Sequence, residues 1–203
     1  MTILENVTFG EHYFSTAVLL RESLFLSSVL SSADIWYNLS TTDIKQLEDL
    51  DLSLIRKILC APISVPVEAL YLELGVLNIE TLVKIKRVNY LQDLVKTNPE
   101  EMLHKFFLRQ WKHPASGDWT LQVSKDLEDF DIPVDLKFIQ SKSKFSFHNL
   151  VKRKAKEHAF FTYLEKKATH SKLDGLFYSD LKSEDYLKSN MLTPYEAKTV
   201  FSY

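Results

Sequence analysis

Residues 36–75 read WYNLSTTDIKQLEDLDLSLIRKILCAPISVPVEALYLELG, and this stretch decides the fold class of the chain. Apolar residues recur in it at spacings of three and four, which places them on one face of an α-helix. A first helix is predicted from caps at residues 40–42 through Leu59, with one apolar stripe formed by Ile44, Leu47, Leu50, Leu54 and Ile58. A second helix is predicted between Ser64, as its cap, and Gly75, a typical helix stop, with Pro66 near its first turn.

Helical periodicity continues on both sides of this stretch. Further helices are predicted over residues 13–28, 78–95, 98–111, 118–127 and 146–169, and one more begins at Thr193. The predicted buried face of helix 98–111 consists of Leu103, Phe106, Phe107 and Trp111. The predicted core includes Trp36, Tyr37, Leu70, Leu74, Phe107 and Trp111. Because the chain has only four Gly and six Pro, it is expected to be all-α, as an irregular multi-helix array.

The clearest break in the chain lies at positions 113–118, where Pro and Gly occur together with small polar residues. Two helical subdomains are therefore expected, residues 1–113 and residues 114–203, the second containing a basic helix. The helix that begins at Thr193 has made only about two turns when the sequence stops at Tyr203. The second subdomain is therefore expected to be truncated at its C-terminus.

The composition is that of a folded protein without a membrane span. The chain is 45% hydrophobic and 26% charged, far from the signature of a disordered protein. Arg21 and Glu22 interrupt the apolar run from Tyr13 to Leu30, which favours an amphipathic helix over a membrane helix. No signal-peptide pattern opens the sequence, so the protein is expected in the cytoplasm or nucleus and not outside the cell. The single cysteine, Cys60, excludes an intramolecular disulfide and a multi-cysteine zinc cluster.

Positive charge is concentrated in residues 137–172, which hold ten Lys or Arg and two acidic residues. A row of cations along a helix neutralises successive phosphates and releases counterions, which gives salt-sensitive binding to RNA or DNA. The first candidates for phosphate contacts are Lys152, Arg153, Lys154 and Lys156, and the second are Lys142, Lys144, Lys166 and Lys167. The alternative is that this run of charge is a solvated face, or that it pairs with the acidic remainder of the chain.

No catalytic residue, metal site or cofactor is predicted. Asp180, Glu196 and Lys198 have the spacing of a metal-dependent nuclease motif, but helix-start signals surround Glu196, which is better explained as the capping partner of Thr193. An acidic cluster lacks the glycine and the ordered spacing of a calcium-binding loop, and is predicted to be a solvated helix end; its members are Asp126, Glu128, Asp129 and Asp131.

The opening stretch resembles the region that follows the polymerase core in non-LTR retrotransposon reverse transcriptases. In that family an aromatic W-Y-N-L entry precedes a helix ending in R-K-I-L, and a Pro-initiated helix reading E-A-L-Y-L-E-L-G follows. The matching residues are 36–39, 56–59, Pro66 and 68–75. The resemblance continues through Phe106-Phe107-x3-Trp111, Asp118-Trp119, residues 170–172 and residues 186–188, and covers the chain from about residue 11 to its end.

The resemblance implies the thumb-distal or linker region of such a polymerase, which would bind nucleic acid without being an enzyme. The Tyr-x-Asp-Asp polymerase signature does not occur in the 203 residues, and neither does the Cys-x-x-Cys…His zinc knuckle that commonly follows in relatives. Two alternatives stay open. The chain is a helical interaction module that self-associates or binds a protein partner through exposed apolar surface, or it is the product of a degenerate reading frame without selected function.

Overall fold

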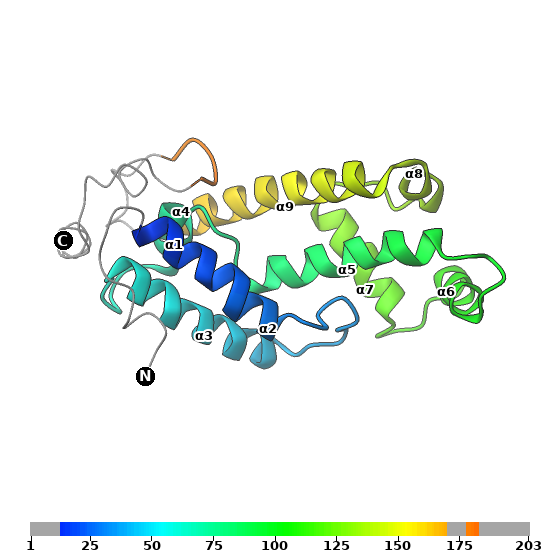
Figure 1. The fold of residues 1–203 in the computed structure, drawn as a ribbon, viewed down its shortest axis with the longest axis horizontal. Helices are drawn as coiled ribbons and strands as arrows, with labels where there is room; N and C mark the ends of the chain where they lie inside the picture. Colours follow the sequence, from blue (N-terminus) through cyan, green and yellow to red (C-terminus); the bar gives the residue numbers. More distant parts are fainter. Residues whose placement is uncertain (1–12, 170–177, 183–203) are drawn as a thin grey trace. The chain divides into compact units, whose positions relative to one another are not determined.

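A computed structural model of the chain describes residues 13–169 and 178–182. Every regular element within these residues is helical, which confirms the predicted all-α, multi-helix fold (Figure 1). The first helical stretch consists of α1 (Tyr13–Leu20), a π-helical segment η2 (Arg21–Leu26) and α2 (Ser27–Val29). The helices that follow are α3 (Thr41–Leu59), α4 (Val67–Leu74), α5 (Ile79–Lys96), α6 (Met102–Lys112), α7 (Trp119–Asp129), α8 (Leu136–Ser141) and α9 (Lys144–Lys167). None of these described helices is both long and apolar enough to cross a lipid bilayer.

The chain forms two compact units, each built from separated segments. Of the described residues, the first unit contains 13–31, 45–78, 159–169 and 178–182, and the second contains 32–44 and 79–158. Helices α3 and α9 therefore each begin in the second unit and end in the first. The expected boundary between residues 113 and 114 falls inside the second unit, where it connects α6 to α7. The helix expected from Thr193 lies outside the described residues.

A buried ion pair joins η2 to α3 within the first unit. Arg21 Nε and Nη2 donate to the two carboxylate oxygens of Asp51 at 2.7 and 2.6 Å, and both side chains are almost fully buried. Arg21 Nη2 also donates to the carbonyl oxygen of Leu77 at 3.0 Å. The guanidinium group thus connects η2, α3 and the segment that precedes α5.

Helix α3 buries only part of the predicted stripe: Ile58 is buried, whereas Ile44, Leu47 and Leu54 are half-buried. Its buried residues are Asp51, Ile55, Ile58 and Leu59. Leu50, which was expected in the core, is 58% exposed. The apolar pattern alone would place the carboxylate of Asp51 in solvent, but the pair with Arg21 allows it to occupy a core position.

The last turns of α9 belong to the first unit and complete its core. The ring of Tyr163 stacks on the ring of Tyr71, with the ring centroids 5.2 Å apart. The Tyr163 hydroxyl accepts a hydrogen bond from the backbone N–H of Asn78 at 2.9 Å. The predicted core residues Leu70 and Leu74 are both buried in this unit.

The predicted helix ends at Ser40 and Gly75 are confirmed. The backbone N–H of Asp43 donates to Ser40 Oγ at 3.1 Å, and the N–H of Ser40 donates to Asp43 Oδ2 at 2.9 Å. These reciprocal bonds form a capping box at the start of α3. Gly75 ends α4 in the left-handed region, at φ 63°, and its N–H donates to the carbonyl oxygen of Leu72 at 3.1 Å. Glycine is favoured there because it has no Cβ to clash.

In the second unit, α5 packs against α6, α7 and α8. The core contains the buried residues Val88, Leu91, Leu94, Val95, Phe107, Val123, Leu127, Phe130, Ile132, Ile139, Phe147, Val151 and Ala155. Arg87 and Asp126 form a second buried ion pair, with N···O distances of 2.6 and 3.0 Å. Asp126 was expected in a solvated cluster at a helix end, and this expectation is wrong because Arg87 compensates its burial.

Several aromatic residues lie nearer the surface than predicted. Tyr37 is 54% exposed, although it was assigned to the core. Trp36 and Trp111 are half-buried at the edge of the second unit, whereas Phe107 is buried as expected. Residues 32–44 are held to this unit by their backbone, since the carbonyl oxygens of Asp34 and Trp36 accept hydrogen bonds from Trp119 and Arg87.

Candidate nucleic-acid interface

Helix α9 carries most of the predicted phosphate-contacting residues and agrees closely with the helix expected over residues 146–169. A row of residues spaced by four faces the protein core: Phe147, Val151, Ala155, Ala159 and Tyr163. Residues four apart lie on the same side of a helix, so the positions between them point sideways or outward. The hydrophobic row thereby fixes the orientation of every charged side chain on α9.

Three predicted residues share one side of α9 within the second unit. Lys152 and Arg153 are exposed and Lys156 is half-buried. At 3.6 residues per turn, the three side chains leave the helix within an arc of about 100°. Lys152 and Lys156 form no ion pair with any described residue, and Arg153 makes only a long contact, 3.9 Å from Glu157. Because that contact lies in solvent, it holds the guanidinium group weakly. We call Lys152, Arg153 and Lys156 the cationic face.

Lys144 and Lys154 are instead paired with carboxylates of the same unit. Lys144 Nζ lies 2.7 Å from Asp93 Oδ1, and Lys154 Nζ lies 2.8 Å from Asp131 Oδ2. The hydrogen bond from Lys154 lowers the pKa of Asp131, and the same bond raises the pKa of Lys154. For these two lysines, the alternative of pairing with the acidic remainder of the chain is confirmed.

The other second-choice residues lie outside the part of α9 that carries the cationic face. The ammonium group of Lys142 lies 5.0 Å from the centre of the Phe138 ring. Lys166 and Lys167 belong to the first unit, where the Lys167 ammonium group lies 5.9 Å from the centre of the Tyr178 ring. Lys166 is exposed and forms no ion pair with a described residue.

The aromatic residues of α9 divide between core and surface. Phe147 and Tyr163 are buried, but Phe145 is 79% exposed and Phe161 is 62% exposed. Phe145 belongs to the same unit as the cationic face and lies about two helical turns before Lys152 on α9. An exposed ring beside phosphate-binding cations is available to stack on an unpaired base.

Protonation of His148, near the start of α9, is expected to make the stability of the fold depend on pH. Burial lowers the pKa of its imidazole, Lys144 lowers it further, and Asp93 partly opposes the shift. Its Nε2 atom is buried and has no hydrogen-bond partner among the described residues. The folded protein therefore favours the neutral ring, whereas the unfolded chain titrates near the ordinary value of 6.5.

The free energy of unfolding is therefore expected to fall as the pH drops through 6.5 toward the lower folded-state pKa of His148. The sign follows because the unfolded state binds more protons than the folded state in this range. Urea denaturation between about pH 5 and 7 measures the slope, which His148→Gln should make shallower. An unchanged slope in this variant would remove His148 as its cause.

Three of the four residues of the acidic cluster at the end of α7 form ion pairs. Asp129 accepts from Lys84 at 2.8 Å, in addition to the Asp126 and Asp131 pairs described above. Within the described part of the chain, no group of three or more His, Cys, Asp or Glu residues is placed to hold a metal ion. Of the nuclease-like trio, Asp180 pairs with Lys182, and Glu196 and Lys198 lie outside the described residues.

Comparison of this chain with protein-family models, with curated proteins and with solved structures finds no match. The assignment of a function therefore rests on the residues of this chain and their geometry.

Proposed function

We propose that this chain is a non-catalytic part of a reverse-transcriptase-like retroelement protein that binds the backbone of RNA or DNA in the cytoplasm or nucleus. The observation that carries the proposal is the cationic face, where Lys152, Arg153 and Lys156 project from one side of α9. No described carboxylate forms a close ion pair with these three side chains, whereas Lys144 and Lys154 are each paired with one. Three adjacent cations on one side of a helix can neutralise neighbouring phosphates of a nucleic-acid strand and release their counterions.

Binding of this kind is electrostatic and independent of sequence, because cations read phosphates and not base edges. Phe145 adds a ring that favours single-stranded or unpaired nucleotides, since a stacked base must be free of its own partner. The role is binding rather than catalysis, since the resemblance is to a region beyond the polymerase palm and no Tyr-x-Asp-Asp sequence occurs in the 203 residues.

Replacing Lys152, Arg153 and Lys156 together by Glu is expected to abolish nucleic-acid binding at moderate salt. Each lost phosphate contact removes roughly 0.7–0.9 from the slope of log affinity against log salt, so three contacts remove about 2–3. Fluorescence anisotropy with labelled single-stranded RNA, single-stranded DNA and duplex DNA, at several salt concentrations, measures affinity and slope together.

A matched control carries the same change of net charge at exposed lysines elsewhere: Lys45, Lys57 and Lys125, all replaced by Glu. This control should keep most of the affinity and the slope, provided that circular dichroism shows both variants folded. Equal losses in the two variants would mean that total charge, and not the cationic face, governs binding. Absence of binding by the wild-type protein at low salt would refute the proposal.

A further inference from the structure

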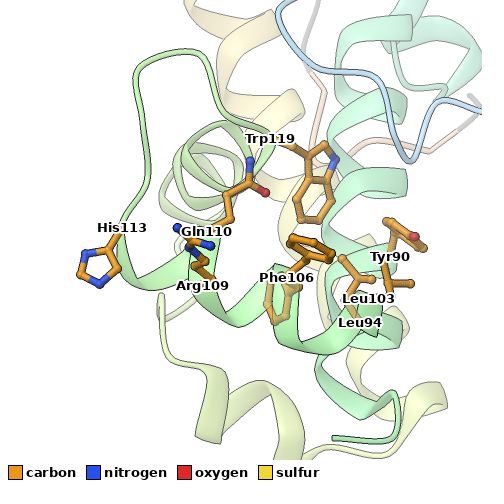
Figure 2. A pocket seen from close by; sticks show the side chains of 9 residues that line it. Tyr90, Leu94, Leu103, Phe106, Arg109, Gln110, His113 and Trp119 are labelled. Atoms are coloured by element: carbon orange, nitrogen blue, oxygen red, sulfur yellow. The ribbon is translucent and has the colours of Figure 1, made fainter. Parts of the chain in front are cut away.

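A pocket of about 590 Å³ lies in the second unit, and none of the residues that line it belongs to α9. It is lined by Tyr90, Leu94, Leu103, Phe106, Phe107, Arg109, Gln110, His113 and Trp119. These residues come from α5, from α6 and its C-terminal cap, and from the first position of α7. Figure 2 shows the aromatic and aliphatic side chains gathered at one end, with Arg109 and His113 toward the other.

The wall formed by α6 is open to solvent. Leu103 is 51% exposed and Phe106 is 60% exposed, although both were predicted to lie on the buried face of this helix. Met102, one position before Leu103, is 73% exposed. The buried residues of α6 are His104 and Phe107, which lie on the side of the helix that packs against the unit. A contiguous group of exposed large apolar side chains on one helix is typical of a surface that a partner covers.

The charged rim of the pocket is positive. Arg109 lines it and is exposed, and no described carboxylate pairs with its guanidinium group. Lys112 is exposed on the same helix, also without a described acidic partner, whereas Lys105 is paired with Glu100. No Asp or Glu is among the residues that line the pocket. An occupant therefore needs acidic groups beside its apolar ones.

We infer that this pocket is a docking groove for an acidic amphipathic helix of a partner protein. The apolar side chains of the partner helix would pack on Phe106, Leu103 and Trp119, and its carboxylates would meet Arg109. Helix α6 has 11 residues and is about 16 Å long, which accommodates three turns of a partner helix with anchors spaced by three and four. Aromatic and arginine side chains are the residues that most often dominate binding energy at such interfaces.

The probe is a fluorescein-labelled amphipathic peptide of about 16 residues, long enough to form a helix, with Leu and Phe on one face and Glu on the other. A twin peptide carries Lys in place of Glu. The full-length protein is expected to bind the Glu peptide at least about tenfold more tightly than the Lys peptide. Arg109→Glu should reverse this preference, because it exchanges the sign of the charge at the rim.

Phe106→Ser should weaken binding of the Glu peptide at least about tenfold. Phe161→Ser is the matched control, since Phe161 is 62% exposed, is likewise helical and lies in the other unit. Leu103→Ser provides a second test at the same wall. Circular dichroism melting checks that the variants are folded.

Three results would overturn the inference: equal affinity for the two peptides, no binding of the Glu peptide, or an equal loss in the Phe161→Ser control. Sedimentation velocity tests whether the occupant of the groove is a second copy of this chain. A wild-type dimer that Phe106→Ser dissociates would assign the groove to a second copy of this chain instead of a partner. Binding of the peptide by the cationic-face variant, at wild-type affinity, would show that the two sites act independently.

Discussion

Replacing Asp51 with alanine is expected to lower the free energy of unfolding by about 3–5 kcal/mol, because the substitution leaves Arg21 as an uncompensated buried charge. Both side chains of the pair are 1% exposed or less, so water cannot replace the lost carboxylate without opening the first unit. The loss is measured by urea denaturation at neutral pH, followed by circular dichroism.

Two further variants distinguish a buried pair from an ordinary one. The double change Arg21→Met with Asp51→Leu should recover much of the lost stability, because it removes both charges together. Glu100→Ala breaks the exposed pair with Lys105, whose side chains are 59% and 84% exposed, and should cost less than about 1 kcal/mol. A loss of this small size in Asp51→Ala as well would show that Arg21 reaches solvent in solution.

Phe147→Ala is expected to lower the stability of the second unit by about 3–5 kcal/mol, through lost burial and the cavity left behind. Phe147 is 0% exposed and begins the row that attaches α9 to this unit. All three tryptophans of the chain lie in the second unit, so their fluorescence during urea denaturation reports its unfolding.

Phe145→Ala is the control for this prediction. Phe145 is a phenylalanine of the same helix, two positions earlier, but it is 79% exposed, and its removal should change stability by no more than about 0.5 kcal/mol. Similar losses in the two variants would mean that α9 is turned differently from the orientation described, which would also displace the cationic face.

Local signals in the sequence were sufficient for most of the helices, though not for α8, and for several of the helix ends. Ser40 caps the start of α3 and Gly75 ends α4 through hydrogen bonds to residues three positions away, so the local sequence is enough to predict both helix ends. The all-α class followed from the spacing of apolar residues over many turns, which tolerates errors at single positions.

The details of burial depended on distant partners. Asp51 is buried because Arg21 lies 30 residues away in sequence and beside it in space, and Asp126 is buried because Arg87 lies 39 residues away. No local pattern carries this information. Conversely, Leu103 and Phe106 have the spacing of a buried face, but the described residues leave both side chains exposed.

The candidate interface was predictable as a segment but not as a set of side chains. Charge clustering identifies α9, yet it does not distinguish Lys156, which is unpaired, from Lys154, whose partner Asp131 lies 23 residues away. Val151 and Ala155 are buried, which fixes the side of α9 that faces the core. The orientation of Lys152, Arg153 and Lys156 follows from this. The buried row includes two alanines, whose small side chains make the apolar stripe weak in the sequence.

The interleaving of the two units has a consequence for the order of events at the ribosome. The second unit possesses all of its segments once residue 158 has been synthesised. The first unit, which contains the earliest helices, still lacks Tyr163, whose ring covers Tyr71 and whose hydroxyl binds the backbone of Asn78. Of the described helices, the earliest in the sequence are thus among the last to complete their core, and we expect a nascent chain to pass through a stage at which the second unit is folded and the first is still open.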